Sequence, residues 1–306
     1  MGCALWGRAL GPVVAAENAA PAAPAAAPGE VMVSHVGMTR EAFVGTNEND
    51  TKAAYRALNA ELGKKHGDHF VAEITVFDNL ADFRQAIQLG RVTFIITSSW
   101  DYLAMGIEDA ADIEFVPTSD RDAAHRWLLL VRQDSRFKSA QDLEGGKVLV
   151  LHTPTASLGE RWLETIGPEA GAAGAAHSFA SLVTVTKPIK AILPVFFGKA
   201  DACVVDEVAF KVMVEMNPQV GRTLHPIAQS EPLVASLICF SRTGWSPARL
   251  RAHLSQTLPE LHTDLAGQQV LTLFKCERLL PFEPAQLDSV RRLFARHRQL
   301  QNTPSP

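Results

Sequence analysis

The stretch Lys147–Trp162 (KVLVLHTPTASLGERW) places the strongest constraint on what this chain can fold into. It opens with a short apolar run, which is typical of a buried strand, and continues into a hydroxyl-rich turn that contains a proline. Apolar residues then recur every fourth position from Leu158 onward, so a helix begins directly after the turn. Either Thr155 or Ser157 caps that helix. A strand, a tight turn and a helix in this order are typical of an α/β protein.

The turn between this strand and this helix has two interpretations. The first backbone N–H groups of a helix lack partners, and the helix dipole is positive there, so the turn could hold an anionic group. Alternatively it is an ordinary capped helix start, which every helix of an α/β protein needs. The remaining sequence has to decide between the two.

Short apolar segments alternate with helical patterns in two successive units, which predicts two mostly parallel sheets with helices on their faces. The predicted strands lie at 31–36, 70–77, 92–97 and 113–116 in the first unit, and at 126–132, 147–151, 181–186, 202–205 and 233–240 in the second. Beyond residue 240 the apolar residues recur at helical spacing to the end of the chain. The predicted fold is therefore α/β, with two three-layer lobes and a helical C-terminal segment.

Length and charge narrow the class further. A chain of 306 residues exceeds the usual size of one domain, which agrees with two lobes. A net charge of -4 and the lack of a basic stripe argue against nucleic acid as a partner. Residues 1–29 form a weakly apolar stretch followed by an Ala/Pro tract, which predicts an export signal and a linker, or alternatively a disordered cytosolic extension.

Polar side chains cluster where the predicted strands end. In open parallel sheets, ligands bind outside the carboxyl ends of the strands, because loops and helix N-termini gather there. With two lobes facing each other, these loops would line one interlobe cleft and bind a small polar molecule. The candidate ligand-binding residues are Asn47, Asp50, Ser98, Ser99, Trp100, Tyr102, Thr153, Thr155, Ser157, Lys187 and Asp206.

Several of these candidates have a second interpretation. Trp100 and Tyr102 could stack on a ligand or belong to the core. Lys187 could pair with an anion or be a solvated loop charge. Asp206 could accept a hydrogen bond from a ligand, or cap the helix that begins at Glu207. If the ligand carries an amino group, Asp206 would pair with it, whereas a bare dianion would be repelled.

The sequence indicates neither an enzyme nor a cofactor. Cys203 and Cys239 lie in apolar strand segments, where a free thiol packs as a small hydrophobic group. His66 and His69 are three positions apart, but no third metal ligand lies near them in the sequence. The sequence motifs of hydrolases, metalloproteases, P-loop proteins and dinucleotide-binding proteins are all missing, so we expect no catalysis, no metal and no cofactor.

Three segments resemble one known family. They are FRQAIQLGRVTFIITSSWDYL, LLLVRQDSRFKSAQDLEGGKVLVLHTPTASLG and AILPVFFGKADACVVDEVAF, in that order. Over about residues 30–300 the chain resembles the periplasmic substrate-binding proteins of ABC transporters with the two-lobed type 2 fold, especially the phosphate- and phosphonate-binding branch. The turn Thr-Pro-Thr-Ala-Ser departs from the Ser-Thr-Ser run usual in phosphonate binders, since Pro154 removes an N–H group and Ala156 a hydroxyl.

The resemblance implies a domain division and partners. Lobe 1 would comprise 30–120 and 243–306, lobe 2 would comprise 121–242, and the chain would cross near 119–121 and 242–244. A small, anionic ligand would be held by the turn 153–157, the loop 98–102 and Asp206, with the lobes hinging shut on it. The protein would be an exported, periplasmic monomer that delivers its ligand to an ABC permease, with its N-terminal segment as a means of membrane association.

Two other functions remain compatible with the resemblance, and both rest on the fold alone. A sensory or chaperone component would bind a ligand without transport, and it would lack a neighbouring permease and ATPase in the genome. A transferase on the same fold would turn over its ligand and would need an acid/base pair between the lobes.

Overall fold

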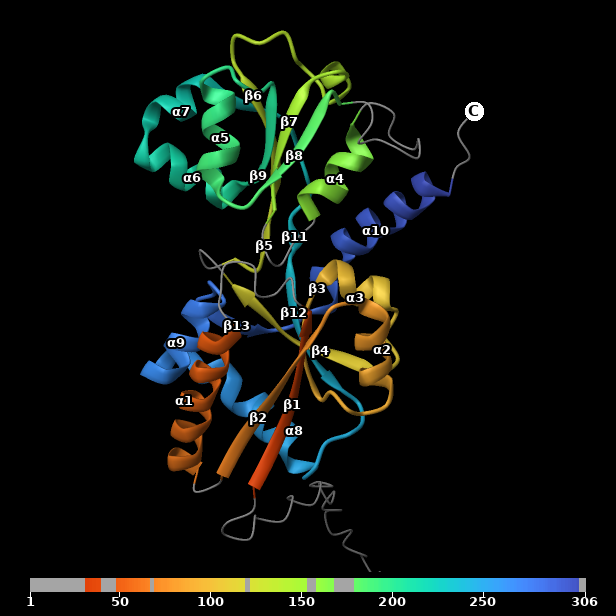
Figure 1. Ribbon diagram of the computed structural model, residues 1–306, viewed down its shortest axis with the longest axis vertical. Coiled ribbons are helices and arrows are strands. Elements are labelled where there is room, and N and C mark those ends of the chain that lie inside the picture. The colour runs from red at the N-terminus through yellow and green to blue at the C-terminus, as the bar shows by residue number, and fades with distance from the viewer. Residues whose placement is uncertain are drawn as a thin grey trace, which may run out of the picture.

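The computed structural model describes residues 31–39, 48–66, 69–118, 122–152, 158–167 and 179–302. It consists of two α/β lobes stacked along the long axis of the molecule (Figure 1), which confirms the predicted two-lobed α/β class. Within the described residues, no helix is both long enough and apolar enough to cross a membrane.

Lobe 1 is built on a six-stranded sheet of order β13-β4-β12-β3-β1-β2. Its strands are β1 (Val31–Thr39), β2 (His69–Phe77), β3 (Phe94–Ser98), β4 (Ala111–Thr118), β12 (Ser236–Ser241) and β13 (Arg278–Pro281). β1 to β4 run in one direction, as predicted, because β1 is parallel to β2 and β3, and β12 is antiparallel to both β3 and β4. The sequence order did not predict that β12 would lie between β3 and β4.

Helices cover both faces of this sheet. They are α1 (Glu48–His66), α2 (Leu80–Gln88), α3 (Ser99–Met105), α8 (Arg249–Thr257) and α9 (Leu265–Leu273). A further helix, α10 (Asp288–Gln301), lies at the junction of the two lobes. On one face α8 and α9 pack through Leu254 and Val270 against Phe94 and Phe240 of the sheet. α2 and α3 contribute to a second core on the other face, and burying both faces stabilises the lobe through the hydrophobic effect.

Lobe 2 is built on a five-stranded sheet of order β10-β6-β9-β7-β8. Its strands are β6 (Trp127–Arg132), β7 (Lys147–Leu151), β8 (Ser181–Val185), β9 (Ala202–Asp206) and β10 (Leu224–Gln229), and its helices are α4 (Leu158–Ile166), α5 (Pro188–Phe196), α6 (Glu207–Met216) and α7 (Pro218–Thr223). β7 is parallel to β8 and β9, whereas β6 is antiparallel to β9 and β10. Apart from exposed Lys147 at the start of β7 and half-buried Asp206 at the end of β9, these two central strands are buried and apolar, as strands covered on both faces are.

Close packing fixes α4 against this sheet. A Cβ atom at Gly159 would lie 2.3 Å from Cε3 of Trp127, so only glycine lets the helix approach β6 this closely. This contact fixes the N-terminal end of α4 against the sheet. The strand and the helix predicted for this stretch are confirmed as β7 and α4, whereas the predicted turn lies outside the described residues.

A short two-stranded ladder joins the lobes. β5 (Ala124–His125) pairs antiparallel with β11 (Leu233–Val234), and both lie between the two large sheets (Figure 1). The expected first crossing, 119–121, lies outside the described residues. The second crossing, which we expected at 242–244, requires a correction, because β12 already belongs to the lobe 1 sheet and the chain therefore leaves lobe 2 at β11. The apolar run 233–240 had been predicted as one strand, whereas it divides between the ladder and the sheet.

Candidate functional site

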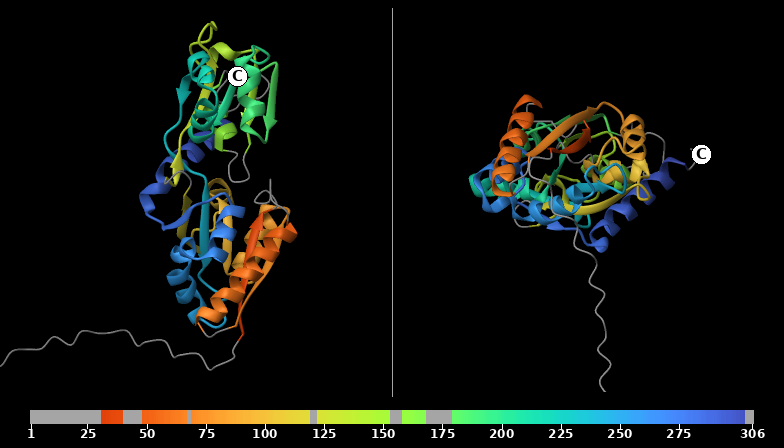
Figure 2. Two further views of the ribbon diagram at one scale, coloured as in Figure 1. Left: turned by 90° about the vertical axis from the view of Figure 1, so that its left-hand side faces the viewer. Right: turned by 90° about the horizontal axis from the view of Figure 1, so that it is seen from below.

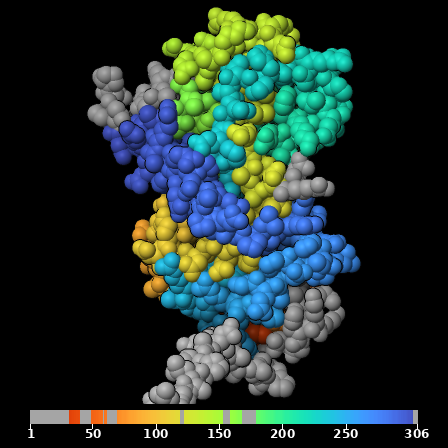
Figure 3. Space-filling model, turned by 180° about the vertical axis from the view of Figure 1, so that it is seen from behind, coloured from red at the N-terminus to blue at the C-terminus, as the bar shows by residue number. Residues whose placement is uncertain are grey.

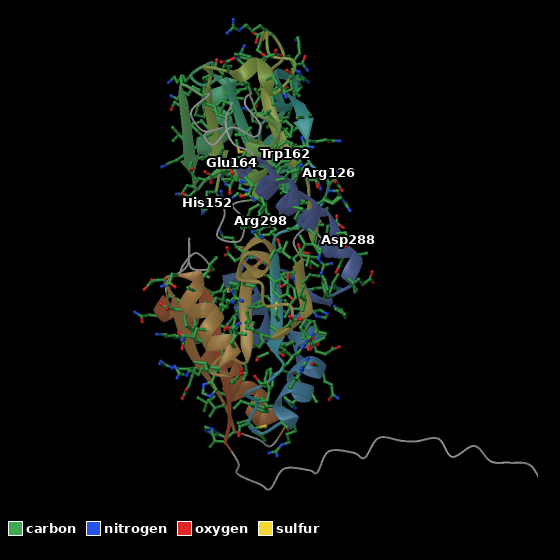
Figure 4. All side chains as sticks on the ribbon, turned by 90° about the vertical axis from the view of Figure 1, so that its right-hand side faces the viewer. Arg126, His152, Trp162, Glu164, Asp288 and Arg298 are labelled. Atoms are coloured by element: carbon green, nitrogen blue, oxygen red, sulfur yellow. The ribbon has the colours of Figure 1, made fainter. Side chains whose placement is uncertain are left out.

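The carboxyl ends of the parallel strands meet at the junction between the lobes. β1 and β3 of lobe 1 end on the side that faces lobe 2, and β7, β8 and β9 end on the side that faces lobe 1 (Figure 1). His152, the residue after β7, lies at the edge of lobe 2 next to this junction (Figure 4). Its N–H group donates to the carbonyl of Val185 at 2.8 Å, which holds the ends of β7 and β8 level. The topology therefore brings together, between the lobes, the strand ends at which we predicted the site.

In lobe 1, the start of α3 is tied to the ladder between the lobes. Oγ of Ser98 accepts a hydrogen bond from the N–H group of Asp101 at 2.9 Å and so caps α3. Ser99 is completely buried, and its hydroxyl donates to the carbonyl of Val234 at 2.6 Å. Its backbone N–H group donates to the carbonyl of Ala235 at 2.9 Å. Ser99 therefore fastens β3 and α3 to the chain that connects the lobes.

Trp100 and Tyr102 could have stacked on a ligand or belonged to the core. In this arrangement of the lobes both are buried in the core. Trp100 is 8% exposed, and its ring lies 4.9 Å from that of Phe294 on α10. The hydroxyl of Tyr102 donates to the carbonyl of Ala111 at 3.1 Å. Burial raises the pKa of Tyr102, so the phenol stays protonated and keeps that hydrogen bond.

In lobe 2, the two described candidates stand at strand ends that face the junction. Oδ1 of Asp206 accepts a hydrogen bond from the N–H group of Ala209 at 2.7 Å, so Asp206 caps α6 as one interpretation predicted. The residue is nevertheless half-buried rather than enclosed. Lys187 is exposed at the end of β8, in the residue before α5, and makes no capping bond with its side chain.

The other predicted residues divide into two groups. Asn47 and the turn residues Thr153, Thr155 and Ser157 lie outside the described residues, so the proposed anion-binding turn stays a prediction. Asp50 is exposed on the first turn of α1, which begins at Glu48, two residues before Asp50. It lines a shallow groove that α1 forms with α9 and Lys275 of the same lobe.

A network at the ladder was not predicted from the sequence. The N–H group of Arg126 donates to Oε1 of Glu207 at 2.9 Å, and that of Glu207 donates to the carbonyl of Arg126 at 2.9 Å. The guanidinium of Arg126 also donates to the carbonyl of Ser230 at 3.1 Å. These bonds link the Asp206–Glu207 turn to both chains that leave lobe 2. No local sequence pattern indicates them, because the partners are far apart along the chain.

The described residues give no support to metal or thiol chemistry. No group of three or more His, Cys, Asp or Glu side chains among them could hold a metal ion. Burial raises the pKa of the thiols of Cys203 and Cys239, and it raises the pKa of Cys276 to about 12, so none is an activated nucleophile.

The sequence matches a protein family over most of this fold. Residues 44–289 match the model of the phosphonate periplasmic substrate-binding proteins of ABC transporters, and the chain belongs to this family. The protein is thus a periplasmic substrate-binding protein of the phosphonate type, from a family of transport proteins rather than enzymes. A search of curated proteins found no match.

Solved structures show the same fold at low sequence identity. XAC2383 of Xanthomonas citri, whose structure contains ATP, has a TM-score of 0.62 and 15% identity, over 89% of this chain and 98% of its own. A binding protein component of an ABC phosphonate transporter of Pseudomonas aeruginosa has a TM-score of 0.57 and 12% identity, over 88% and 87%. PhnD1 of Prochlorococcus marinus, in complex with methylphosphonate, has a TM-score of 0.55 and 12% identity, over 88% and 99%.

Proposed function

We propose that this protein captures a small anionic solute, a phosphonate, phosphate or related oxyanion, between its lobes and delivers it to an ABC permease. The observation that carries the proposal is the family match over residues 44–289, which includes the ends of β3, β7, β8 and β9 at the junction. In this proposal the protein is exported by its N-terminal segment and works as a monomer. The proposed binding site is formed or supported by the candidate residues Asn47, Asp50, Ser98, Ser99, Trp100, Tyr102, Thr153, Thr155, Ser157, Lys187 and Asp206.

The described geometry favours some of these residues for direct contact. Lys187 is exposed and can supply positive charge to an anion at the end of β8. The hydroxyls of Ser99 and Tyr102 already donate hydrogen bonds to backbone carbonyls. These two residues therefore support the site by holding α3 in place rather than by contacting the solute. The turn 153–157 supports the anion proposal through its place between the central strand β7 and the N-terminus of α4.

A thermal-shift screen with purified protein tests this proposal. The panel contains phosphate, methylphosphonate, 2-aminoethylphosphonate, methanesulfonate, an amino acid and ATP. A solute at 100 times its Kd should stabilise the protein by ~2.7 kcal/mol. We expect a phosphonate or phosphate to raise the melting temperature, and isothermal titration then gives its Kd. If only the amino acid stabilises the protein, the anionic class is wrong.

Asp206 distinguishes two kinds of anionic solute, and asparagine is the suitable replacement because it caps a helix as well as aspartate does. We expect Asp206→Asn to leave the melting temperature of the free protein unchanged. If the solute carries an amino group, the variant should bind 2-aminoethylphosphonate about tenfold more weakly. For methylphosphonate it should bind more tightly, because the repulsion between two negative charges is gone. An unchanged Kd for both solutes would remove Asp206 from the site.

A further inference from the structure

Three helices meet where the lobes join, on the side of the connecting ladder. In Figure 2, left, α10 lies beside β5 and β11 on one side of the molecule, and β1 and β2 lie on the other. Seen from behind, α10 runs across the junction from one lobe to the other (Figure 3). It packs against α3 of lobe 1 and against α4 of lobe 2. Any rotation of one lobe against the other must therefore change the packing of α10.

The first half of α10 is fastened to the ladder. The hydroxyl of Ser289 donates to the carbonyl of Pro232 at 2.6 Å, and Arg292 forms an ion pair with Glu231. Both partners immediately precede β11. Further along the helix, Phe294 packs against Trp100 of α3. α10 is thus fixed to the connection and to lobe 1, so that lobe 2 is the part that can move relative to it.

The contact with lobe 2 is polar and partly buried. Nε2 of His297 on α10 lies 2.5 Å from Oε2 of Glu164 on α4, and His297 is only 5% exposed. Arg161, one turn earlier on α4, lies with its guanidinium carbon 5.5 Å from the centre of the Trp100 ring. Its Nη1 is 3.3 Å from Oε2 of Glu164. Trp100, Arg161, Glu164 and His297 together form what we call the interlobe cluster; Figure 4 labels Glu164 next to the junction.

Two properties indicate that the contacts of this cluster can form in only one arrangement of the lobes. A cation over an aromatic face and a hydrogen bond to a carboxylate both depend on distances of a few ångströms, so a rotation of α4 would break or weaken them.

We propose that the interlobe cluster stabilises the arrangement in which the strand ends of the two lobes stand apart, and that it thereby lowers the affinity of the protein for its solute. The inference rests on the proposed function, because a solute that bridges the lobes selects the closed arrangement. Closure must then overcome the contacts of the cluster, and the apparent Kd is the Kd of the closed arrangement divided by the fraction of molecules that are closed. Weakening the cluster should therefore tighten binding.

The test uses the double variant Arg161→Met/Glu164→Gln, which keeps side chains of similar length. Its control, Arg296→Met/Glu160→Gln, makes the same charge changes on α10 and α4 at an exposed and a half-buried residue that take no part in the hydrogen bonds and ion pairs of the cluster described above. Spin labels on exposed Arg56→Cys of α1 and Lys190→Cys of α5 report the distance between the lobes. The background carries Cys3→Ser and Cys276→Ser, since the remaining cysteines, Cys203 and Cys239, are completely buried.

Without solute, we expect the cluster variant to shift part of the distance distribution to shorter values and the control to match the parent. With methylphosphonate as the titrant, the cluster variant should bind about threefold to tenfold more tightly. A solute-free distribution identical to that of the parent overturns the inference, as does an unchanged Kd in a protein that binds the titrant. If the solute-free shift occurs and no anion of the panel binds, the cluster has the role inferred here and the proposed function is wrong.

Discussion

The two lobes place polar residues at the ends of their strands in the same way but use them differently. In lobe 1, the residues after β3 are capped, buried or hydrogen-bonded within the protein, as Ser99 and Trp100 show. In lobe 2, the residues after β8 and β9 remain exposed or half-buried, as Lys187 and Asp206 show. The comparison teaches that the same sequence signal, polar groups after a buried strand, marks a joint between the lobes in one place and a surface open to solvent in the other.

Trp100→Ala should have the largest effect and tests the structural side of this comparison. Removing a buried aromatic side chain that packs against Phe294 and His297 should lower the free energy of unfolding by ~3–5 kcal/mol. Denaturant unfolding of the solute-free protein measures it. A loss below about 1 kcal/mol, combined with a loss of solute binding, would instead make Trp100 a ligand-contacting residue.

Gly159→Ala tests whether the packing of α4 in lobe 2 affects both stability and solute binding. The added methyl group would lie 2.3 Å from Cε3 of Trp127, so the helix or the ring has to shift. Overpacking of this kind should cost ~1–3 kcal/mol of stability. The variant should also bind the solute more weakly than the parent, because α4 carries the turn 153–157. The control is Ala57→Ser on α1, an exposed position where we expect neither the stability nor the solute affinity to change. Gly198→Ala would not serve, because Gly198 has a φ of +68° and alanine would be strained there.

Ser99→Ala should have a smaller effect on stability and a detectable one on the junction. The carbonyl of Val234 would lose its buried donor, at a cost of ~1–3 kcal/mol. Because this bond fastens the ladder to α3, the distance distribution between the labelled lobes should broaden. A stability loss without broadening would show that Ser99 serves the fold alone.

Lys187→Gln should have the smallest effect on stability and tests the solute-binding side. The side chain is exposed and makes no capping bond, so the melting temperature of the free protein should not change. If Lys187 contacts the anion, the Kd should rise about tenfold, equivalent to ~1.4 kcal/mol. Exposed Lys190→Gln, one turn further along, is the matched control and should leave the Kd unchanged.

The sequence alone predicted the elements whose signal is local. The apolar run of β7 and the fourfold spacing of α4 determine the strand and the helix, because burial in a covered sheet and one apolar helix face each leave a periodic pattern. The family resemblance was equally visible in three ordered segments, and the match over residues 44–289 confirms it.

Only the tertiary structure decided what depends on pairs that are far apart in the chain. The insertion of β12 between β3 and β4, the burial of Ser99 under Val234 and the approach of His297 to Glu164 join residues more than 100 positions apart. Periodicity records whether a side chain is buried but not which partner buries it, since many partners satisfy the same apolar or polar requirement. The sequence therefore determined the lobes of this protein, and the packing of α3, α4 and α10 determined how they are joined.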